Sequence, residues 1–249
     1  MARGGEKSVT IPNVYSDQRR AEAYAKLEFP GTYYLAYRDL PEIIAKHVTG
    51  KRGIDFGCGA GRSTRFLARL GFGVVGVDIS EEMIAKAKVL DPPGDYRLLG
   101  TEALPELGQG AYDVILSCFT FDHVPKREEK VAIFTQLGRL LAPSGCIINL
   151  VSSPEIYWYE WASFSTKDYP ENRNAKCGDV VRIVMTDVED RRPVEDVIFP
   201  EADYRRVYAD AGLEVVEVYR PLGREDEPYQ WVNETAIAPW TIYVLKRAE

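Results

Sequence analysis

Three glycines within five residues are the first feature of the sequence that suggests chemistry. The stretch IDFGCGAGRS, residues 54–63, places Gly57, Gly59 and Gly61 directly after a short apolar run. Glycine inside regular structure costs roughly 0.5–1 kcal/mol of stability, so the chain must use the bare backbone for something. A loop without Cβ atoms lets a ligand approach the N–H groups that begin the next helix. The stretch therefore predicts a ligand-binding turn between a strand and a helix.

Two carboxylates accompany the glycines. Asp55 lies two residues before Gly57, and Asp78 ends the apolar run VVGVD. A carboxylate at the end of the second strand can accept hydrogen bonds from both hydroxyls of a ribose. The spacing is G-x-G-x-G, with Arg62 where the dinucleotide fingerprint G-x-G-x-x-G has its third glycine. The pattern favours a nucleoside ligand and counts against a dinucleotide, with ordinary strand-end carboxylates as the alternative interpretation.

His123, in the stretch FDHVP, follows the fourth predicted strand and is expected at the mouth of the same cleft. A histidine titrates near neutral pH, which suits removal of a proton from a hydroxyl or an ammonium group. We therefore consider His123 as a general base or as a group that orients an acceptor. The alternative is a loop histidine held by a hydrogen bond. Cys58 and Cys118 have no evident base partner, so we expect them to pack rather than to act as nucleophiles.

The elements that must position these residues alternate between strands and helices. We expect strands over residues 52–57, 73–78, 95–99, 112–119, 146–152, 213–220 and 240–247, and helices over 62–71, 80–90 with Ser80 as N-cap, 126–145 and 201–212. The early strands are continuous apolar runs, as in parallel sheets that are buried on both faces. The alternation predicts an α/β fold: a Rossmann-like, doubly wound, seven-stranded and mostly parallel sheet with an inserted segment.

We expect one domain over residues 1–249 in four parts. These are an N-terminal helical cap over 1–50 with helices over 16–27 and 31–48, the second broken near Pro41, a cofactor-binding core over 51–153, an insertion over 154–200, and the C-terminal part of the sheet over 201–249. The insertion is aromatic and ends in a predicted hairpin over 179–199. A long inserted segment is often functional, so we expect a lid. Trp158, Tyr159 and Trp161 could wall an acceptor pocket or form a small core of their own.

Composition excludes several classes of partner. The net charge of −7 and the pI near 5.1 predict a surface that repels phosphate backbones, so we expect no nucleic acid partner. The N-terminal stretch has no apolar core, and no apolar run is long enough to span a membrane. Four cysteines without C-x-x-C spacing, beside two histidines, predict reduced thiols in a cytoplasmic protein and no metal site. Oligomeric state stays open.

Residues 30–151 resemble a known family. The stretches IDFGCGAGRSTRFLARLGFGVVGVDISEEMIAKAK and LLGTEALPELGQGAYDVILSCFTFDHVP look like the cofactor half of a class I S-adenosylmethionine-dependent methyltransferase of the small-molecule type. The stretch ADYRRVYADAGLEVVEVYRP is similar to the family's last helix and strand. Residues 154–200 match nothing in it. The resemblance implies S-adenosylmethionine as cofactor.

The resemblance also implies roles for individual residues. Asp55 and the glycine loop, with Cys58 inside it, would hold the methionine part of the cofactor, while Asp78 would bind the ribose hydroxyls. The remaining implied contacts are Ile79 on adenine, Thr101 or Glu102 at the adenine amine where the family often has an acidic residue, Ser117 and Cys118 on the methionine side, and Arg38 at the methionine carboxylate.

The resulting hypothesis is methyl transfer to an oxygen or nitrogen of a small-molecule acceptor. The acceptor atom would attack the methyl group directly, and S-adenosylhomocysteine would leave. Two other hypotheses stay open: a nicotinamide-dependent oxidoreductase on a Rossmann fold, and a cofactor-binding protein without catalysis.

Overall fold

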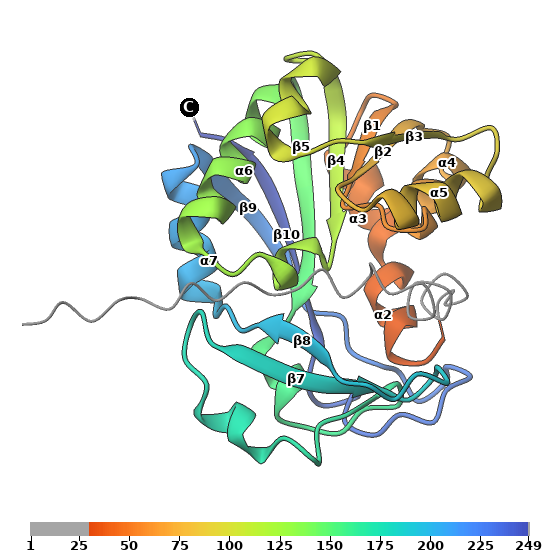
Figure 1. The fold of residues 1–249 in the computed structure, drawn as a ribbon, viewed down its shortest axis with the longest axis vertical. Coiled ribbons are helices and arrows are strands. Elements are labelled where there is room, and N and C mark those ends of the chain that lie inside the picture. Colours follow the sequence, from red (N-terminus) through yellow and green to blue (C-terminus); the bar gives the residue numbers. More distant parts are fainter. Residues whose placement is uncertain (1–29, 249) are drawn as a thin grey trace, which may run out of the picture.

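The main sheet has seven strands, and all but one of them run in the same direction. In the computed structural model, which describes residues 30–248, the order is β3 (Asp95–Leu98), β2 (Gly73–Asp78), β1 (Arg52–Phe56), β4 (Tyr112–Cys118), β5 (Leu141–Ser152), β10 (Trp240–Arg247) and β9 (Leu213–Tyr219). The first five strands run parallel, and β10 is antiparallel to both of its neighbours. The predicted Rossmann-like, mostly parallel sheet is confirmed (Figure 1).

Helices cover both faces of this sheet because the strands bury side chains on both faces. One apolar cluster joins the sheet to α2 (Thr32–Arg38), α3 (Leu40–His47) and α4 (Arg62–Arg69). A second cluster joins the other face to α6 (Arg127–Leu140) and α7 (Glu201–Asp210). The helix expected over residues 16–27, with the rest of the first 29 residues of the predicted cap, lies outside the described part.

Local signals place most helix ends correctly. The Ser80 side chain accepts a hydrogen bond from Met83 N at 3.3 Å, so it caps α5 (Glu81–Leu90) as predicted. The break near Pro41 is also found, because α2 ends at Arg38 and Pro41 lies in the first turn of α3. No helix among residues 30–248 has the length and apolar character needed to cross a membrane.

One predicted boundary is wrong. We expected a helix to residue 145 and a strand from 146, but α6 ends at Leu140 and β5 begins at Leu141. The pairing of β4 with β5 shifts between Tyr112 and Val114, so residues 142–145 form an irregularity inside the strand. The Tyr112 carbonyl lies 2.6 Å from where a Cβ of Gly145 would be, and only glycine allows this approach. That contact across strands is not visible in the local pattern.

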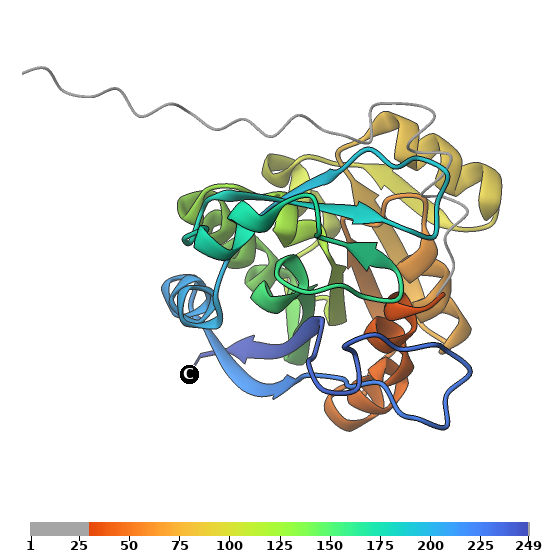
Figure 2. The same ribbon diagram turned by 90° about the horizontal axis from the view of Figure 1, so that it is seen from below.

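The insertion folds as a small antiparallel sheet. It contains η4 (Pro154–Tyr157), β6 (Phe164–Ser165), η5 (Pro170–Asn174), β7 (Val180–Met185) and β8 (Val194–Val197). The predicted hairpin is present as β7 and β8. These strands lie across the carboxyl ends of the parallel strands, and the view from that end shows the insertion in front of the main sheet (Figures 1 and 2). The insertion therefore faces the edge at which the glycine turn lies.

Candidate active site

The glycine turn needs glycine for two separate reasons. Gly57, Gly59 and Gly61 have φ values of +73°, +52° and +83°, a region that side chains rarely adopt. A Cβ on Gly57 would lie 2.1 Å from Thr120 Oγ1, and one on Gly61 would lie 2.5 Å from the Tyr96 hydroxyl. A Cβ on Gly59 would have no atom of residues 30–248 within 4 Å, its chain neighbours aside. Gly57 and Gly61 are thus needed so that Thr120 and Tyr96 can pack against the turn. At Gly59 the described residues leave space beside the backbone.

Asp55 lies beneath the turn and is fully buried. Its Oδ2 accepts hydrogen bonds from Ser63 Oγ at 2.7 Å and Thr64 Oγ1 at 2.6 Å, both in the first turn of α4. Its Oδ1 is buried and has no hydrogen-bond partner among the described residues. Burial raises the pKa of Asp55 to about 6, against the lowering effect of the two hydroxyls. One carboxylate oxygen therefore fixes the helix, and the other is left as an acceptor.

Asp55 should make stability fall as the pH rises. The folded pKa of about 6 exceeds the unfolded value of 3.8, so the folded state binds more protons between these values. The contribution of Asp55 to the free energy of unfolding is fully present at pH values below the unfolded pKa. It is lost as the pH rises through the folded pKa, and the loss between pH 5 and pH 7.5 is roughly 1.4 kcal/mol. Asp55→Asn keeps an acceptor for Ser63 and should remove this part of the slope in urea unfolding. Asp95→Asn, on an exposed carboxylate, is the control, and an unchanged slope in Asp55→Asn would contradict the assignment.

Asp78 joins the turn to the next helix. Its Oδ2 accepts from Gly59 N at 2.8 Å and its Oδ1 accepts from Ser80 N at 2.9 Å. Burial raises the pKa of Asp78, opposed by these N–H donors and by His123. Ile79, the next residue, is 72% exposed although it is apolar. The end of β2 thus offers a charged acceptor beside an open apolar surface.

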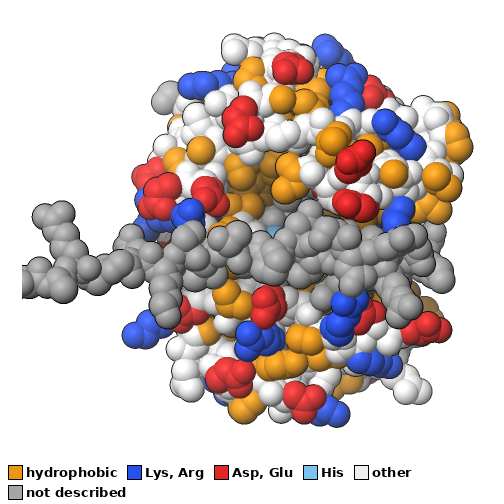
Figure 3. Space-filling view, in the orientation of Figure 1, with side chains coloured by type: hydrophobic (Ala, Val, Ile, Leu, Met, Phe, Trp, Pro, Cys, Tyr) orange, Lys and Arg blue, Asp and Glu red, His pale blue; other side chains and the backbone are white. Residues whose placement is uncertain are grey.

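Thr101 and Glu102 lie at the same edge of the sheet. They begin η2 (Thr101–Leu107), and the turn before it is tied to β2 because Leu99 N donates to Asp78 O at 2.9 Å. Figure 3 shows hydrophobic side chains gathered in a hollow on this face, between the α6 side and the α5 side. The hollow and the polar ends of β2 and η2 together suit a flat base attached to a sugar.

The end of β4 supplies the other side of the site. Ser117 Oγ is buried and has no hydrogen-bond partner among the described residues. Burial raises the pKa of Cys118 to about 12 and raises that of Cys58 as well, so both thiols stay protonated. Cys58 packs in a small cluster with Ile84 and Tyr96. The raised pKa values support the prediction that neither cysteine is a nucleophile.

The guanidinium groups of Arg38 and Arg62 have different partners. The Arg38 guanidinium binds both oxygens of Asp39 at 2.7 and 2.8 Å, Glu227 Oε1 at 2.7 Å and the Leu222 carbonyl at 2.9 Å. Its donors are therefore directed to Asp39 and to a C-terminal segment, so the predicted contact with a cofactor carboxylate would require some of these bonds to be given up. Arg62, the first residue of α4, follows the glycine turn directly. Its guanidinium carbon lies 5.0 and 5.3 Å from the ring centres of Tyr33 and Tyr37.

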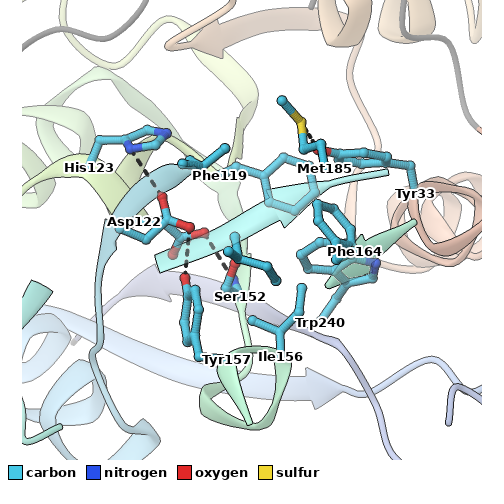
Figure 4. Close-up of a pocket in the computed structure, with 13 residues that line it drawn as sticks. Tyr33, Phe119, Asp122, His123, Ser152, Ile156, Tyr157, Phe164, Met185 and Trp240 are labelled. Atoms are coloured by element: carbon cyan, nitrogen blue, oxygen red, sulfur yellow. Dashed lines mark hydrogen bonds and ion pairs between the residues drawn. The ribbon is translucent and has the colours of Figure 1, made fainter. Parts of the chain in front are cut away.

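A second pocket lies between the end of β4 and the insertion (Figure 4). Its lining is an aromatic wall and an acidic end, formed by Tyr33, Phe119, Asp122, His123, Ser152, Ile156, Tyr157, Phe164, Ile183, Met185, Val194, Asp196 and Trp240. Phe119, which follows the last residue of β4, is the one non-glycine residue with positive φ (+63°) among residues 30–248. Such strain costs roughly 1–3 kcal/mol and is typical of functional sites.

His123 lies in this pocket and is paired with the insertion. Its Nδ1 lies 3.2 Å from Asp196 Oδ1, and the other oxygen of Asp196 accepts from the Tyr157 hydroxyl at 3.0 Å. Asp122, beside His123 in η3 (Thr120–His123), accepts from Ser152 N at 3.1 Å. The His123–Asp196 contact has the distance of an ion pair but does not meet hydrogen-bond geometry. An aspartate this close to Nδ1 can orient an imidazole electrostatically, with Nε2 as the nitrogen that takes a proton. The pair is a candidate general base.

The sequence analysis assigned no role at the site to Asp122, Asp196 or Arg62. Asp196 had one usable signal, because the two-residue period of β8 places it on the same face as the buried Val194. The aromatic residues named in advance do not line the pocket. Trp158 and Trp161 instead donate to the Asn172 and Ile156 carbonyls and pack against the main core.

Comparisons with known proteins agree with this geometry. A family model described as a methyltransferase domain matches residues 54–149. A ubiquinone biosynthesis O-methyltransferase from Burkholderia vietnamiensis is 31% identical over 182 residues, 72% of each chain. A solved S-adenosylmethionine-dependent methyltransferase from Clostridium acetobutylicum has a TM-score of 0.61 at 14% identity, covering 95% of this chain and 97% of its own. Another from Methanosarcina mazei has a TM-score of 0.62 at 17% identity, covering 83% and 98%. The chain therefore belongs to the class I S-adenosylmethionine-dependent methyltransferases, and S-adenosylmethionine is its cofactor.

Proposed function

We propose that this enzyme transfers the methyl group to an oxygen or nitrogen of a small molecule bound in the pocket between β4 and the insertion, with S-adenosylhomocysteine as product. The observation that carries the proposal is the pair of His123 Nδ1 and Asp196 Oδ1 at 3.2 Å, inside a pocket with an aromatic wall. A base beside an apolar pocket suits a compact acceptor that arrives protonated. The relative from Burkholderia vietnamiensis, named as an O-methyltransferase, also supports a small acceptor.

The residues around the glycine turn fit the cofactor. Asp78 would accept hydrogen bonds from the ribose hydroxyls, and Ile79 would pack on adenine. Thr101 or Glu102 would accept a hydrogen bond from the adenine amine. Two buried acceptors without partners among the described residues, Asp55 Oδ1 and Ser117 Oγ, would take the methionine ammonium group.

Arg62, at the helix start, replaces Arg38 in the proposal as the cation for the methionine carboxylate. It begins the helix that follows the turn, and its guanidinium lies over the rings of Tyr33 and Tyr37. Gly57, Gly59, Gly61 and the thiols of Cys58 and Cys118 shape the cavity. Bound S-adenosylmethionine supplies an electrophilic methyl group on a positively charged sulfur.

The protein contributes alignment and one proton transfer. Alignment of two reactants can lower the activation barrier by roughly 7–11 kcal/mol. His123, oriented by Asp196, would take the proton of the acceptor at Nε2, and the acceptor atom would then attack the methyl carbon. The insertion contributes Tyr157, Phe164 and Asp196 to the pocket and would limit the access of water to the reacting atoms. We therefore assign residues 51–153 to cofactor binding and residues 154–200 to a lid that carries acceptor contacts.

Gly59 offers a clean test of the cofactor site. Gly59→Ala and Gly71→Ala both force alanine into positive φ, +52° and +84°, and in both cases the added methyl group would have no neighbour within 4 Å in the described part of the chain. Each variant should lose roughly 1–2 kcal/mol in free energy of unfolding. Only Gly59→Ala should also weaken S-adenosylhomocysteine binding in calorimetry, by at least tenfold, because its methyl group fills ligand space. Equal affinity in the two variants would contradict the proposed position of the cofactor.

The function itself is tested by ligand stabilisation followed by an acceptor screen. At one hundred times its Kd, S-adenosylhomocysteine should stabilise by about 2.7 kcal/mol, which for this chain length is roughly 5 °C or more in Tm. NADH should give no shift. The screen then measures S-adenosylhomocysteine release with alcohols, phenols and amines. Stabilisation by NADH alone, or methyl transfer to RNA or protein and to none of these small molecules, would overturn the proposal.

A further inference from the structure

Three distant segments of the chain meet at a buried polar cluster next to the aromatic residues of the pocket. The cluster, which we call the clasp, consists of the fully buried Thr32, Ser163 and Glu234. Thr32 begins α2, Ser163 lies in the insertion, and Glu234 lies in the segment between β9 and β10. These residues are 131 and 202 positions from Thr32 in the sequence. The clasp therefore joins the N-terminal cap, the insertion and the C-terminal segment at one point.

The carboxylate of Glu234 is the centre of the clasp. Its Oε1 accepts hydrogen bonds from Thr32 Oγ1 at 2.6 Å and from Ala162 N at 2.7 Å. Its Oε2 accepts from Val232 N at 2.8 Å and from Asn233 N at 3.1 Å. A carboxylate is costly to bury unless donors fill its lone pairs in good geometry. Burial of Glu234 therefore requires α2, the insertion and the C-terminal segment to keep one relative position.

Thr32 and Ser163 exchange two further hydrogen bonds. Thr32 N donates to Ser163 Oγ at 2.9 Å, and Ser163 N donates to Thr32 Oγ1 at 3.0 Å. The Thr32 hydroxyl is thus shared, because it accepts from the insertion and donates to Glu234. Gly31 allows the contact, since a Cβ there would lie 2.3 Å from Ser163 Oγ. A slip of one residue would leave buried groups unpaired, so the junction has one register.

The aromatic wall of the pocket is attached to this clasp. The wall consists of Tyr33, Phe119, Phe164 and Trp240 (Figure 4). Tyr33 follows Thr32 in the chain, and Phe164 follows Ser163. Trp240 Nε1 donates to the Thr32 carbonyl at 2.8 Å. Three of the four wall residues are therefore neighbours of the clasp in sequence or are hydrogen-bonded to it.

The ring contacts of the wall depend on the register that the clasp sets. The ring centres of Tyr33 and Phe164 lie 5.1 Å apart, and that of Trp240 lies 5.9 Å from Tyr33 and 5.7 Å from Phe164. Apolar packing has little directional preference, so it tolerates several arrangements of three rings. Buried hydrogen bonds are directional and costly to break. The clasp therefore selects the arrangement in which the three rings line the pocket.

We propose that Glu234 is a positioning residue for the methyl acceptor, because the clasp holds the aromatic wall in the shape against which the acceptor packs. This inference rests on the proposed function, since it concerns how the acceptor is held in the same pocket. Glu234 does not line the pocket, so it acts through the wall. A displaced wall moves the acceptor atom away from the methyl carbon. The clasp has no residue in the glycine turn or at the end of β2, so the cofactor contacts should not depend on it.

Two isosteric variants test the proposal with matched losses. Thr32→Val removes the shared hydroxyl of the clasp. Tyr208→Phe removes an equally buried hydroxyl in the apolar cluster around α7, where it accepts from Asn149 Nδ2 at 2.9 Å. Both variants should lower the Tm. With S-adenosylhomocysteine saturating, phenol is titrated by calorimetry as a neutral aromatic probe. Only Thr32→Val should weaken phenol binding, by roughly tenfold or more, while both variants keep their affinity for S-adenosylhomocysteine within about twofold.

Two further variants of the clasp separate its hydrogen bonds from its bulk. Thr32→Ser keeps the hydroxyl and should restore most of the phenol affinity. Glu234→Gln keeps the shape, but either orientation of the amide turns an NH₂ donor toward a backbone N–H, of Ala162 or of Val232 and Asn233. It should therefore lose phenol affinity as Thr32→Val does.

The indole N–H of Trp240 reports the wall directly. Its ¹⁵N signal can be assigned with Trp240→Phe, and its exchange with solvent should be slow because it is bonded to the Thr32 carbonyl inside the protein. Exchange should stay slow in Tyr208→Phe and become roughly tenfold faster or more in Thr32→Val and Glu234→Gln. Unchanged exchange in the clasp variants would show that the clasp does not hold the wall and would overturn the proposal.

The outcomes separate this inference from the proposed function. Saturation by S-adenosylhomocysteine is measured first, and its failure would remove the proposed function. If S-adenosylhomocysteine binds but phenol affinity falls equally in Thr32→Val and Tyr208→Phe, or in neither, the positioning role is overturned and the proposed function stands. Absence of phenol binding to the native enzyme overturns the positioning role too. Thr32→Val and Glu234→Gln act on the same clasp, so either variant that folds is sufficient for the comparison.

Discussion

Asp78→Ala is expected to weaken S-adenosylhomocysteine binding at least a hundredfold in calorimetry. A hydrogen bond to a charged group contributes about 1.5–3 kcal/mol, and a ribose presents two hydroxyls to this carboxylate. The same side chain holds Gly59 N at 2.8 Å and Ser80 N at 2.9 Å, so its loss also releases the exposed part of the glycine turn. Both effects reduce affinity. The fold should survive, because removing a buried charge offsets part of the loss of two backbone partners.

Two further variants give this prediction its controls. Asp95→Ala removes an exposed carboxylate from the adjacent strand, where it pairs with Arg97, and should leave the affinity unchanged. Asp78→Asn keeps one oxygen acceptor and should fall between the native enzyme and Asp78→Ala. The free energy of unfolding without ligand, measured for all three, separates a binding defect from a folding defect. Native-like affinity in Asp78→Ala would remove the ribose assignment.

The sheet and the glycine turn were predictable because their signals are local. A strand buried on both faces is a continuous apolar run, and a turn that needs positive φ is a glycine. Ser80 caps its helix within three residues, and this short range is why the prediction succeeded. Each of these features depends on neighbours in the chain.

The contacts that the sequence did not reveal join distant segments. Arg38 pairs with Glu227, 189 residues away, and this partner determines where its guanidinium points. Asp196 reaches His123 only because the insertion lies across the end of β4. Trp158 and Trp161 have the composition of a pocket wall, yet they bond to carbonyls within the insertion and pack on the core. Residue type suggests what a side chain can do, and long-range packing decides whether it does it.

His123→Ala is expected to lower kcat by a factor of 10² to 10⁴ with an acceptor identified in the screen. Its affinity for S-adenosylhomocysteine should stay within twofold, because in the proposed mechanism the histidine takes part in proton transfer and does not contact the ribose or the methionine. His47→Ala is the matched control. His47 is the other histidine of the chain. It lies at the end of α3, where it pairs with Glu217 at 2.8 Å, and it does not line the pocket. Its removal should leave kcat unchanged.

Added imidazole distinguishes a missing base from a damaged pocket. In His123→Ala, free imidazole can enter the space left by the side chain and should restore part of kcat, with no effect on His47→Ala. Asp196→Asn should also lower kcat, but combining it with His123→Ala should add little, because an orienting aspartate acts through the histidine that it holds. Additive losses would assign Asp196 an independent role, such as direct contact with the acceptor. Unchanged kcat in His123→Ala would exclude the base, and the aspartates would then be the remaining proton acceptors in the pocket.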